Sequence, residues 1–148
     1  MSGTCSVSVS LPGGRSYPIH IGPGLVGSES FGPFGFPRVV IFVDSRVQRC
    51  APEWIERVVR MVSHSGAEVD CVPVRVAESR KNLASVEALL SALYGLDRVD
   101  RHTVLMAVGG GVLGDMVGFA AAVWLRGLRF VQVERKTADL QRCRSELL

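Results

Sequence analysis

The sequence has no apolar run long enough to cross a membrane. The uncharged segments around the three glycines at 109–111 span about ten to twelve residues, whereas a membrane-spanning helix needs about twenty. No basic start leads into an apolar stretch, which excludes a typical secretory signal, and arginine is scarce near the start, which argues against a transit peptide. These absences predict a cytoplasmic protein, with a plastid location as the alternative if a transit peptide precedes this sequence.

Cysteine and histidine are also few, with four cysteines and three histidines in 148 residues. No two cysteines form a CxxC pair, and the histidines lack the spacing of a metal site. This pattern predicts reduced, mostly buried thiols rather than a disulfide framework. It also predicts no metal ligand and no catalytic residue within this chain.

Aromatic residues make up only 7% of the chain, and the net charge is a modest +3. The basic residues do not cluster with aromatic ones, which excludes nucleic acid as an expected partner. Apolar residues make up 47% and charged residues 21%, as in ordinary globular domains. The sequence therefore predicts one folded domain with a real core and no membrane partner.

The first strands have an alternating pattern. Apolar and polar residues alternate over 7–11 and again over 16–22, and Gly13 and Gly14 lie between them. Such a pair of segments predicts a β-hairpin whose turn the glycines form. A Gly- and Pro-rich connection follows at 31–37.

The rest of the chain alternates between two patterns. Continuous apolar runs predict buried strands at 38–44 and 103–108. Shorter segments predict strands at 68–74 and 128–133. Helical spacing predicts helices at 52–65, from Leu83 to Leu93 after an Asn82 cap, and at 116–125; Leu83, Val86, Leu90 and Leu93 mark the apolar face of the second. This order predicts the α/β class, with a Rossmann-like parallel sheet preceded by an N-terminal β-hairpin. We expect a domain at 1–133 and a divergent charged tail at 134–148, where seven of fifteen residues are charged.

Three glycines, Gly109 to Gly111, stand between a predicted strand and a predicted helix. Glycines at such a turn let the backbone approach a ligand, and the exposed N–H groups of the helix end favour phosphate oxygens. The motif is not the usual GxGxxG. A turn that needs glycine only for tight packing is the alternative interpretation.

Charged residues near the other strand ends are further candidates. Asp44 ends a buried strand. Its carboxylate is suited either to accept hydrogen bonds from ribose hydroxyls or to cap a helix. Glu78 and Lys81 flank the loop after the next strand and either touch a nucleoside or form a solvated pair. Asp115 lies near the start of a predicted helix, where the helix dipole favours a negative charge and the carboxylate is suited to cap the helix. Arg126 follows ten uncharged residues and needs a carboxylate, a phosphate or water as partner.

At these residues the chain resembles the 3-dehydroquinate synthase family. The segments RSYPIHIGPGLV, FVD and ESRK match the family's N-terminal half in order and spacing, and AVGGGVLGDMVGFAAAVWLRGLRFVQV does so most specifically. The resemblance covers Val7 to Val133. It implies a dehydroquinate synthase-like N-terminal domain that binds NAD.

The resemblance also implies roles for individual residues. Asp44, Ser45 and Arg46 would line the adenosine side, with Glu78 and Lys81 matching further contacts. The pyrophosphate would lie on Gly109, Gly110, Gly111 and Val112, with Asp115 nearby. Arg126 matches an arginine that contacts the phosphorylated substrate. The family forms homodimers, and the contact with the substrate in the neighbouring site is the alternative to one in the same chain.

The activity that the resemblance implies is that of a lyase in the shikimate pathway of chorismate and aromatic amino acid biosynthesis. The family's substrate is the sugar phosphate 3-deoxy-arabino-heptulosonate 7-phosphate, which becomes 3-dehydroquinate with release of phosphate. NAD transiently oxidises one hydroxyl, and zinc or another divalent metal polarises that hydroxyl.

The chain departs from the family at two places. Ala77 stands where the family usually has glycine, and ERKTADLQRCRSELL replaces the continuation that leads to the zinc-binding domain. We therefore expect a truncated, catalytically incomplete NAD-binding part. The alternatives are a sugar-phosphate cyclase acting on sedoheptulose 7-phosphate and a non-enzymatic fragment.

Overall fold

The computed structural model describes residues 3–26 and 35–134. The chain divides into two compact units, one spanning residues 1–34 and the other 35–148. No helix in the described ranges is long and apolar enough to cross a membrane. Of the predicted charged tail at 134–148, all but Glu134 lies outside the described residues.

The first unit contains the predicted hairpin. Strand β1 (Cys5–Ser10) pairs antiparallel with β2 (Ser16–Ile21). Gly13 and Gly14 have φ values of 81° and 74°, the left-handed backbone that such a turn requires, so the prediction of their role is confirmed.

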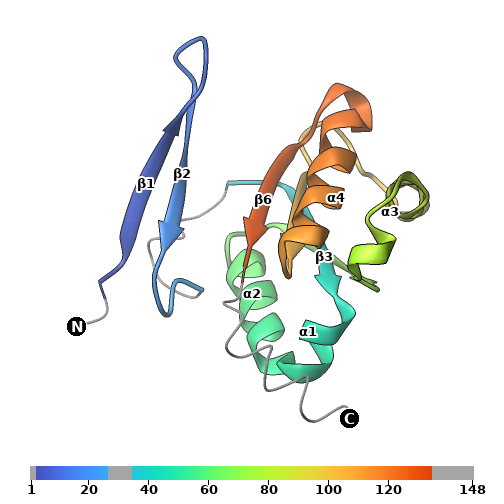
Figure 1. The fold of residues 1–148 in the computed structure, drawn as a ribbon, viewed down its shortest axis with the longest axis horizontal. Helices are drawn as coiled ribbons and strands as arrows, with labels where there is room; N and C mark the ends of the chain where they lie inside the picture. The colour runs from blue at the N-terminus through green and yellow to red at the C-terminus, as the bar shows by residue number, and fades with distance from the viewer. Residues whose placement is uncertain (1–2, 27–34, 135–148) are drawn as a thin grey trace. The chain divides into compact units, whose positions relative to one another are not determined.

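The second unit is an α/β layer structure, which confirms the predicted fold class. Its elements follow each other as β3 (Arg38–Asp44), α1 (Ser45–Cys50), α2 (Pro52–His64), β4 (Glu68–Val74), η1 (Glu78–Arg80), α3 (Leu83–Gly95), β5 (Val104–Val108), α4 (Gly111–Val123), η2 (Trp124–Arg126) and β6 (Arg129–Val133). The four strands are parallel and lie in the order β4-β3-β5-β6. Figure 1 shows α4 running beside β6.

The core lies on both faces of this sheet because β5 is buried along its whole length and β3 is buried from Val39 to Asp44. One face is covered by α3 and α4, and its cluster consists of Val40, Phe42, Leu105 and Ala107 with Val86, Leu89, Leu93, Leu113, Met116, Val117, Ala120 and Ala121. Val39, Ile41 and Val43 alternate with that set along β3, so they face the other side, where α1 packs. Burial on both faces explains the continuous apolar runs in the sequence.

Three predictions about this fold need correction. The helix predicted at 116–125 begins at Gly111, since the third glycine of the motif already has helical geometry. Leu83 was predicted for the buried face of α3 and is 75% exposed, because it is the first residue of that helix. Cys5 and Cys71 are free thiols as predicted, but both are exposed and Cys50 takes part in a disulfide, so the prediction of mostly buried and uniformly reduced cysteines is wrong.

Candidate functional site

The candidate site lies at the carboxyl ends of β3 and β5. Strand β4, which follows β3 in the sequence, pairs with one side of β3, and β5 pairs with the other side. In open α/β sheets, ligands bind in the crevice outside the strand ends at such a reversal of strand order. Val43 and Val108 are the last paired residues, and Asp44 and Gly109 directly follow them.

Gly109 and Asp44 are in close contact. A Cβ atom on Gly109 would lie 3.1 Å from the Asp44 Cβ and 3.1 Å from the Leu113 Cδ2. The Gly109 N–H donates to the Val133 carbonyl oxygen over 3.1 Å, which ties the turn to β6. Tight packing, the alternative interpretation of the triglycine, is therefore confirmed at this first glycine.

The next two glycines have different surroundings. Gly110 is the N-cap of α4, with φ −92° and ψ 179°, and a Cβ atom there would meet nothing within 4 Å. No side chain of the described residues caps this helix. The first N–H groups of α4, from Gly111 and Val112 onward, thus begin beside open space, which is the geometry of an anion cradle.

The three residues predicted for the adenosine side begin at the end of β3. Asp44 is 6% exposed and caps α1, since its Oδ1 accepts from the Arg46 N–H over 2.9 Å. The capping role is therefore confirmed. Ser45 opens α1. The Arg46 side chain places its Nε 3.7 Å from the Asp44 Oδ1 and donates to the Val76 carbonyl oxygen over 2.7 Å. Arg46 thereby joins the end of β3 to the loop after β4.

The loop after β4 is joined to α4 by an ion pair. The Lys81 Nζ lies 2.6 Å from the Asp115 Oδ2, and both side chains are exposed. This hydrogen bond and the Asp115 charge raise the pKa of Lys81. Asp115 lies more than one turn into α4, so it pairs with a lysine instead of capping the helix. Glu78 opens η1 in the same loop and is exposed.

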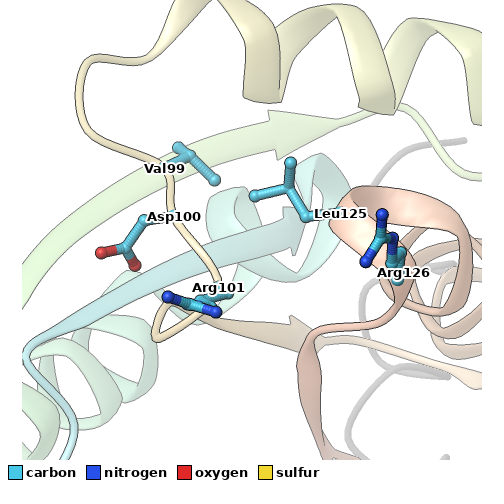
Figure 2. Close-up of a pocket in the computed structure, with 5 residues that line it drawn as sticks. All are labelled: Val99, Asp100, Arg101, Leu125 and Arg126. Atoms are coloured by element: carbon cyan, nitrogen blue, oxygen red, sulfur yellow. The ribbon is translucent and has the colours of Figure 1, made fainter.

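Arg126 is not brought together with the other candidates. It lies in η2 before the amino end of β6, and the 13-residue helix α4, about 20 Å long, separates it from the triglycine. Leu125 and Arg126 both have positive φ values, of 46° and 72°. Figure 2 shows Leu125 facing Val99 across a surface hollow that Asp100, Arg101 and Arg126 also line.

Two residues that sequence reasoning missed lie at the end of β6. The Gln132 Nε2 donates to the Glu134 Oε1 over 2.7 Å. That oxygen lies 3.9 Å from the position of a Cβ atom on Gly111. The only signal for them is their i, i+2 spacing at a strand end, which places both side chains on one face of the sheet.

The fold and the site define a Rossmann-like α/β domain whose helix α4 begins, without a side-chain cap from the described residues, at the topological switch point of the sheet. The family model described as 3-dehydroquinate synthase N-terminal matches residues 71–140. A 3-dehydroquinate synthase of Rhodospirillum rubrum is 42% identical over 130 residues, which are 86% of this chain and 32% of that protein. One of Bordetella pertussis is 40% identical over 128 residues, 86% of this chain and 34% of that protein. The chain is similar to these 3-dehydroquinate synthases over 86% of its own length and spans about a third of theirs.

Solved structures share the fold. A 2-deoxy-scyllo-inosose synthase complexed with carbaglucose-6-phosphate, NAD+ and Co2+ matches 88% of this chain and 35% of its own, with a TM-score of 0.75 and 23% identity. A 2-epi-5-epi-valiolone synthase from Streptomyces hygroscopicus subsp. jinggangensis, with NAD+ and Zn2+ bound, matches 76% of this chain and 30% of its own, with a TM-score of 0.62 and 24% identity. At these identities the likeness concerns the fold.

Proposed function

We propose that this chain forms the NAD-binding part of an enzyme of the 3-dehydroquinate synthase family. The observation that carries the proposal is the contact between Asp44 and Gly109 at the switch point of the sheet. It brings a carboxylate suited to ribose hydroxyls next to a helix N-terminus suited to phosphate, and a dinucleotide needs both. Solved structures of the same fold that contain NAD+ support the choice of ligand.

The cradle has the room that a pyrophosphate needs. A phosphate group has room in the space beside Gly110 that a side chain on this residue would otherwise occupy. The pyrophosphate lies on the N–H groups of Gly110, Gly111 and Val112, where no described side chain caps the helix and the helix dipole favours negative charge. Gly109 contributes by letting this turn pack against Asp44.

The adenosine side of the proposed site is built on α1. Asp44 uses Oδ1 for the Arg46 N–H, so Oδ2 serves to accept from the ribose hydroxyls. Arg46 holds the loop after β4 through the Val76 carbonyl oxygen, which keeps Glu78 and Lys81 of that loop on the nucleotide side. Because Asp115 pairs with Lys81, its role is to position the lysine rather than to touch phosphate.

The whole enzyme, in this proposal, converts 3-deoxy-arabino-heptulosonate 7-phosphate to 3-dehydroquinate. Bound NAD supplies the transient oxidation and re-reduction of one substrate hydroxyl. This chain holds the dinucleotide and fixes its orientation. The described residues contain no group of three or more His, Cys, Asp or Glu side chains that could hold a metal ion, so we assign no step to a metal in them.

Arg126 has a separate place in the proposal. It lies at the amino ends of the strands, whereas the cradle lies at their carboxyl ends. A substrate phosphate beside the bound NAD is therefore met by the Arg126 of a second copy and not by that of the same chain. This arrangement supports a homodimer as the working assembly of the whole enzyme.

The proposal is tested by calorimetric titration of the 148-residue chain with NAD. We expect saturable binding by the natural chain and at least tenfold weaker binding by Gly110→Ala, since the added methyl group takes the space of the phosphate. The variant should fold, because that methyl group meets no atom of the described residues within 4 Å. Alanine is a poorer N-cap than glycine, so we expect a stability loss of about 0.5–1 kcal/mol.

Gly95→Ala is the matched control. A Cβ atom on Gly95 also meets nothing within 4 Å, and this residue ends α3, far along the chain from the cradle. It should bind NAD as the natural chain does. Equal affinity of the Gly110→Ala variant and the natural chain would place the dinucleotide elsewhere, and no binding by a folded natural chain would refute the proposal.

A further inference from the structure

The carboxyl end of β6 brings polar side chains onto the first turns of α4. The Gln132 side chain packs over Gly114, in the space that a Cβ atom on that residue would need. Its Nε2 donates to the Glu134 Oε1 over 2.7 Å. The amide end of the Gln132 side chain thus lies against α4 and also donates a hydrogen bond to the Glu134 carboxylate.

The Glu134 carboxylate lies at the mouth of the cradle. The Glu134 Oε1 lies 3.9 Å from the position of a Cβ atom on Gly111, the first residue of α4. No acidic residue of the helix itself lies in its first turn, so the negative charge near this end comes from the neighbouring strand. A carboxylate beside a helix N-terminus is favourable in the ligand-free chain because it opposes the positive end of the helix dipole.

The same charge is unfavourable once a second anion arrives. We infer that Glu134 sets the affinity of the cradle by holding a carboxylate where a pyrophosphate must bind, an inference that rests on the proposed NAD site. A dinucleotide must approach this carboxylate or displace it from the Gln132 amide. Since the pair lies at the surface, displacement requires only side-chain rotation.

The effect is specific to the phosphates of the ligand. Adenosine carries no charge and touches only the part of the site that Asp44 and Arg46 form. Glu134 should therefore weaken the binding of NAD and of inorganic pyrophosphate while leaving the binding of adenosine unchanged. Added salt should reduce the effect, because the pair is exposed and mobile ions screen such charges.

The test compares the natural 148-residue chain with Glu134→Gln by calorimetric titration with NAD at low salt. The glutamine keeps the size of the side chain and removes its charge. We expect about two- to fivefold tighter binding of NAD by the variant, the range that exposed charges near helix ends produce. Glu134→Ala, which removes the carboxylate completely, should change affinity in the same direction. Glu56→Gln removes one charge from an exposed position on α2 and should leave the affinity unchanged.

The outcomes separate this inference from the proposed function. If the natural chain binds NAD and Glu134→Gln binds it equally or more weakly, the inference is overturned and the NAD site stands. An equal gain in Glu56→Gln would show a general effect of net charge and would also overturn it. If neither the natural chain nor either Glu134 variant binds NAD while all are folded, both the inference and the proposed function are refuted.

Discussion

Adjacent glycines of the triglycine turn meet different physical demands. A Cβ atom on Gly109 would lie 3.1 Å from both the Asp44 Cβ and the Leu113 Cδ2, so a side chain there would require these neighbours to shift. Gly110 has open space and a backbone that any residue adopts. The sequence shows three identical letters, and only the packing of β3 against the turn separates a structural position from a ligand-facing one.

This difference predicts opposite behaviour in two neighbouring variants. Gly109→Ala should lower the free energy of unfolding by about 1–3 kcal/mol, since the Asp44 Cβ and the Leu113 Cδ2 must both move. Gly110→Ala should be clearly less destabilising. Urea unfolding of both variants measures the difference. Equal losses would mean that the Gly109 contact relaxes without strain.

Asp100 is a second residue whose position predicts a measurable effect. Its Oδ1 accepts from the His102 N–H over 2.8 Å and from the Thr103 N–H over 3.1 Å, in the turn that leads into β5. The hydrogen bond from the His102 backbone is the largest cause of the lowered pKa of Asp100, and Thr103 adds to it. The folded chain therefore prefers the charged carboxylate.

A lowered carboxyl pKa contributes stability above its ordinary value of 3.8 and loses it as the pH falls through the folded value. Asp100→Asn keeps an acceptor oxygen without the charge. We expect it to lower the melting temperature at pH 7 and to differ less from the natural chain as the pH falls below 3.8. Thermal unfolding from pH 7 to pH 3 measures this. A difference that does not depend on pH would contradict the assignment.

Among the elements, the N-terminal hairpin contrasts most with the sheet. In its register, Val7 pairs with Ile19 and Val9 with Tyr17, so one face of the ribbon is apolar, whereas serines dominate β1 on the other. Nearly every residue of β1 and β2 is nevertheless exposed. A two-stranded ribbon without burial is only marginally stable in water.

Hydrogen exchange should therefore rank the strands. Amides of β1 and β2 should exchange within the early time points, while those of β5 and of Val39 to Asp44 in β3, which are buried, should require global unfolding. Mass spectrometry of peptic peptides resolves these segments. Protection of the hairpin equal to that of β5 would show that its apolar face is covered in solution.

Element type was predictable where burial and periodicity agree. The strand at 68–74 is confirmed residue for residue as β4, and the helix predicted at 52–65 is α2, which ends at His64 before the positive φ of Gly66. The helix α1 was missed because six residues give too little periodicity, although Asp44 supplies its cap. The start of α4 was placed five residues late because glycines in sequence read as a turn.

At the scale of the whole molecule, the order of strands is what the sequence could not show. The alternation of strand and helix patterns predicts a parallel sheet. Which strands become neighbours in that sheet is decided by tertiary packing. That order makes Asp44 and Gly109 neighbours and sends Arg126 to the opposite edge. Gln132 and Glu134 were missed because their significance depends on β6 lying beside the N-terminus of α4.

The same strand order leaves the two outermost strands unequal in what they offer to another chain. In the part of the chain that the structure describes, β4 and β6 form the two sides of the sheet. β4 includes Pro73, which has no N–H group to donate, whereas β6 is free of proline. Any lateral growth of this sheet, whether by a continuation of the same polypeptide or by a foreign strand, therefore starts from β6.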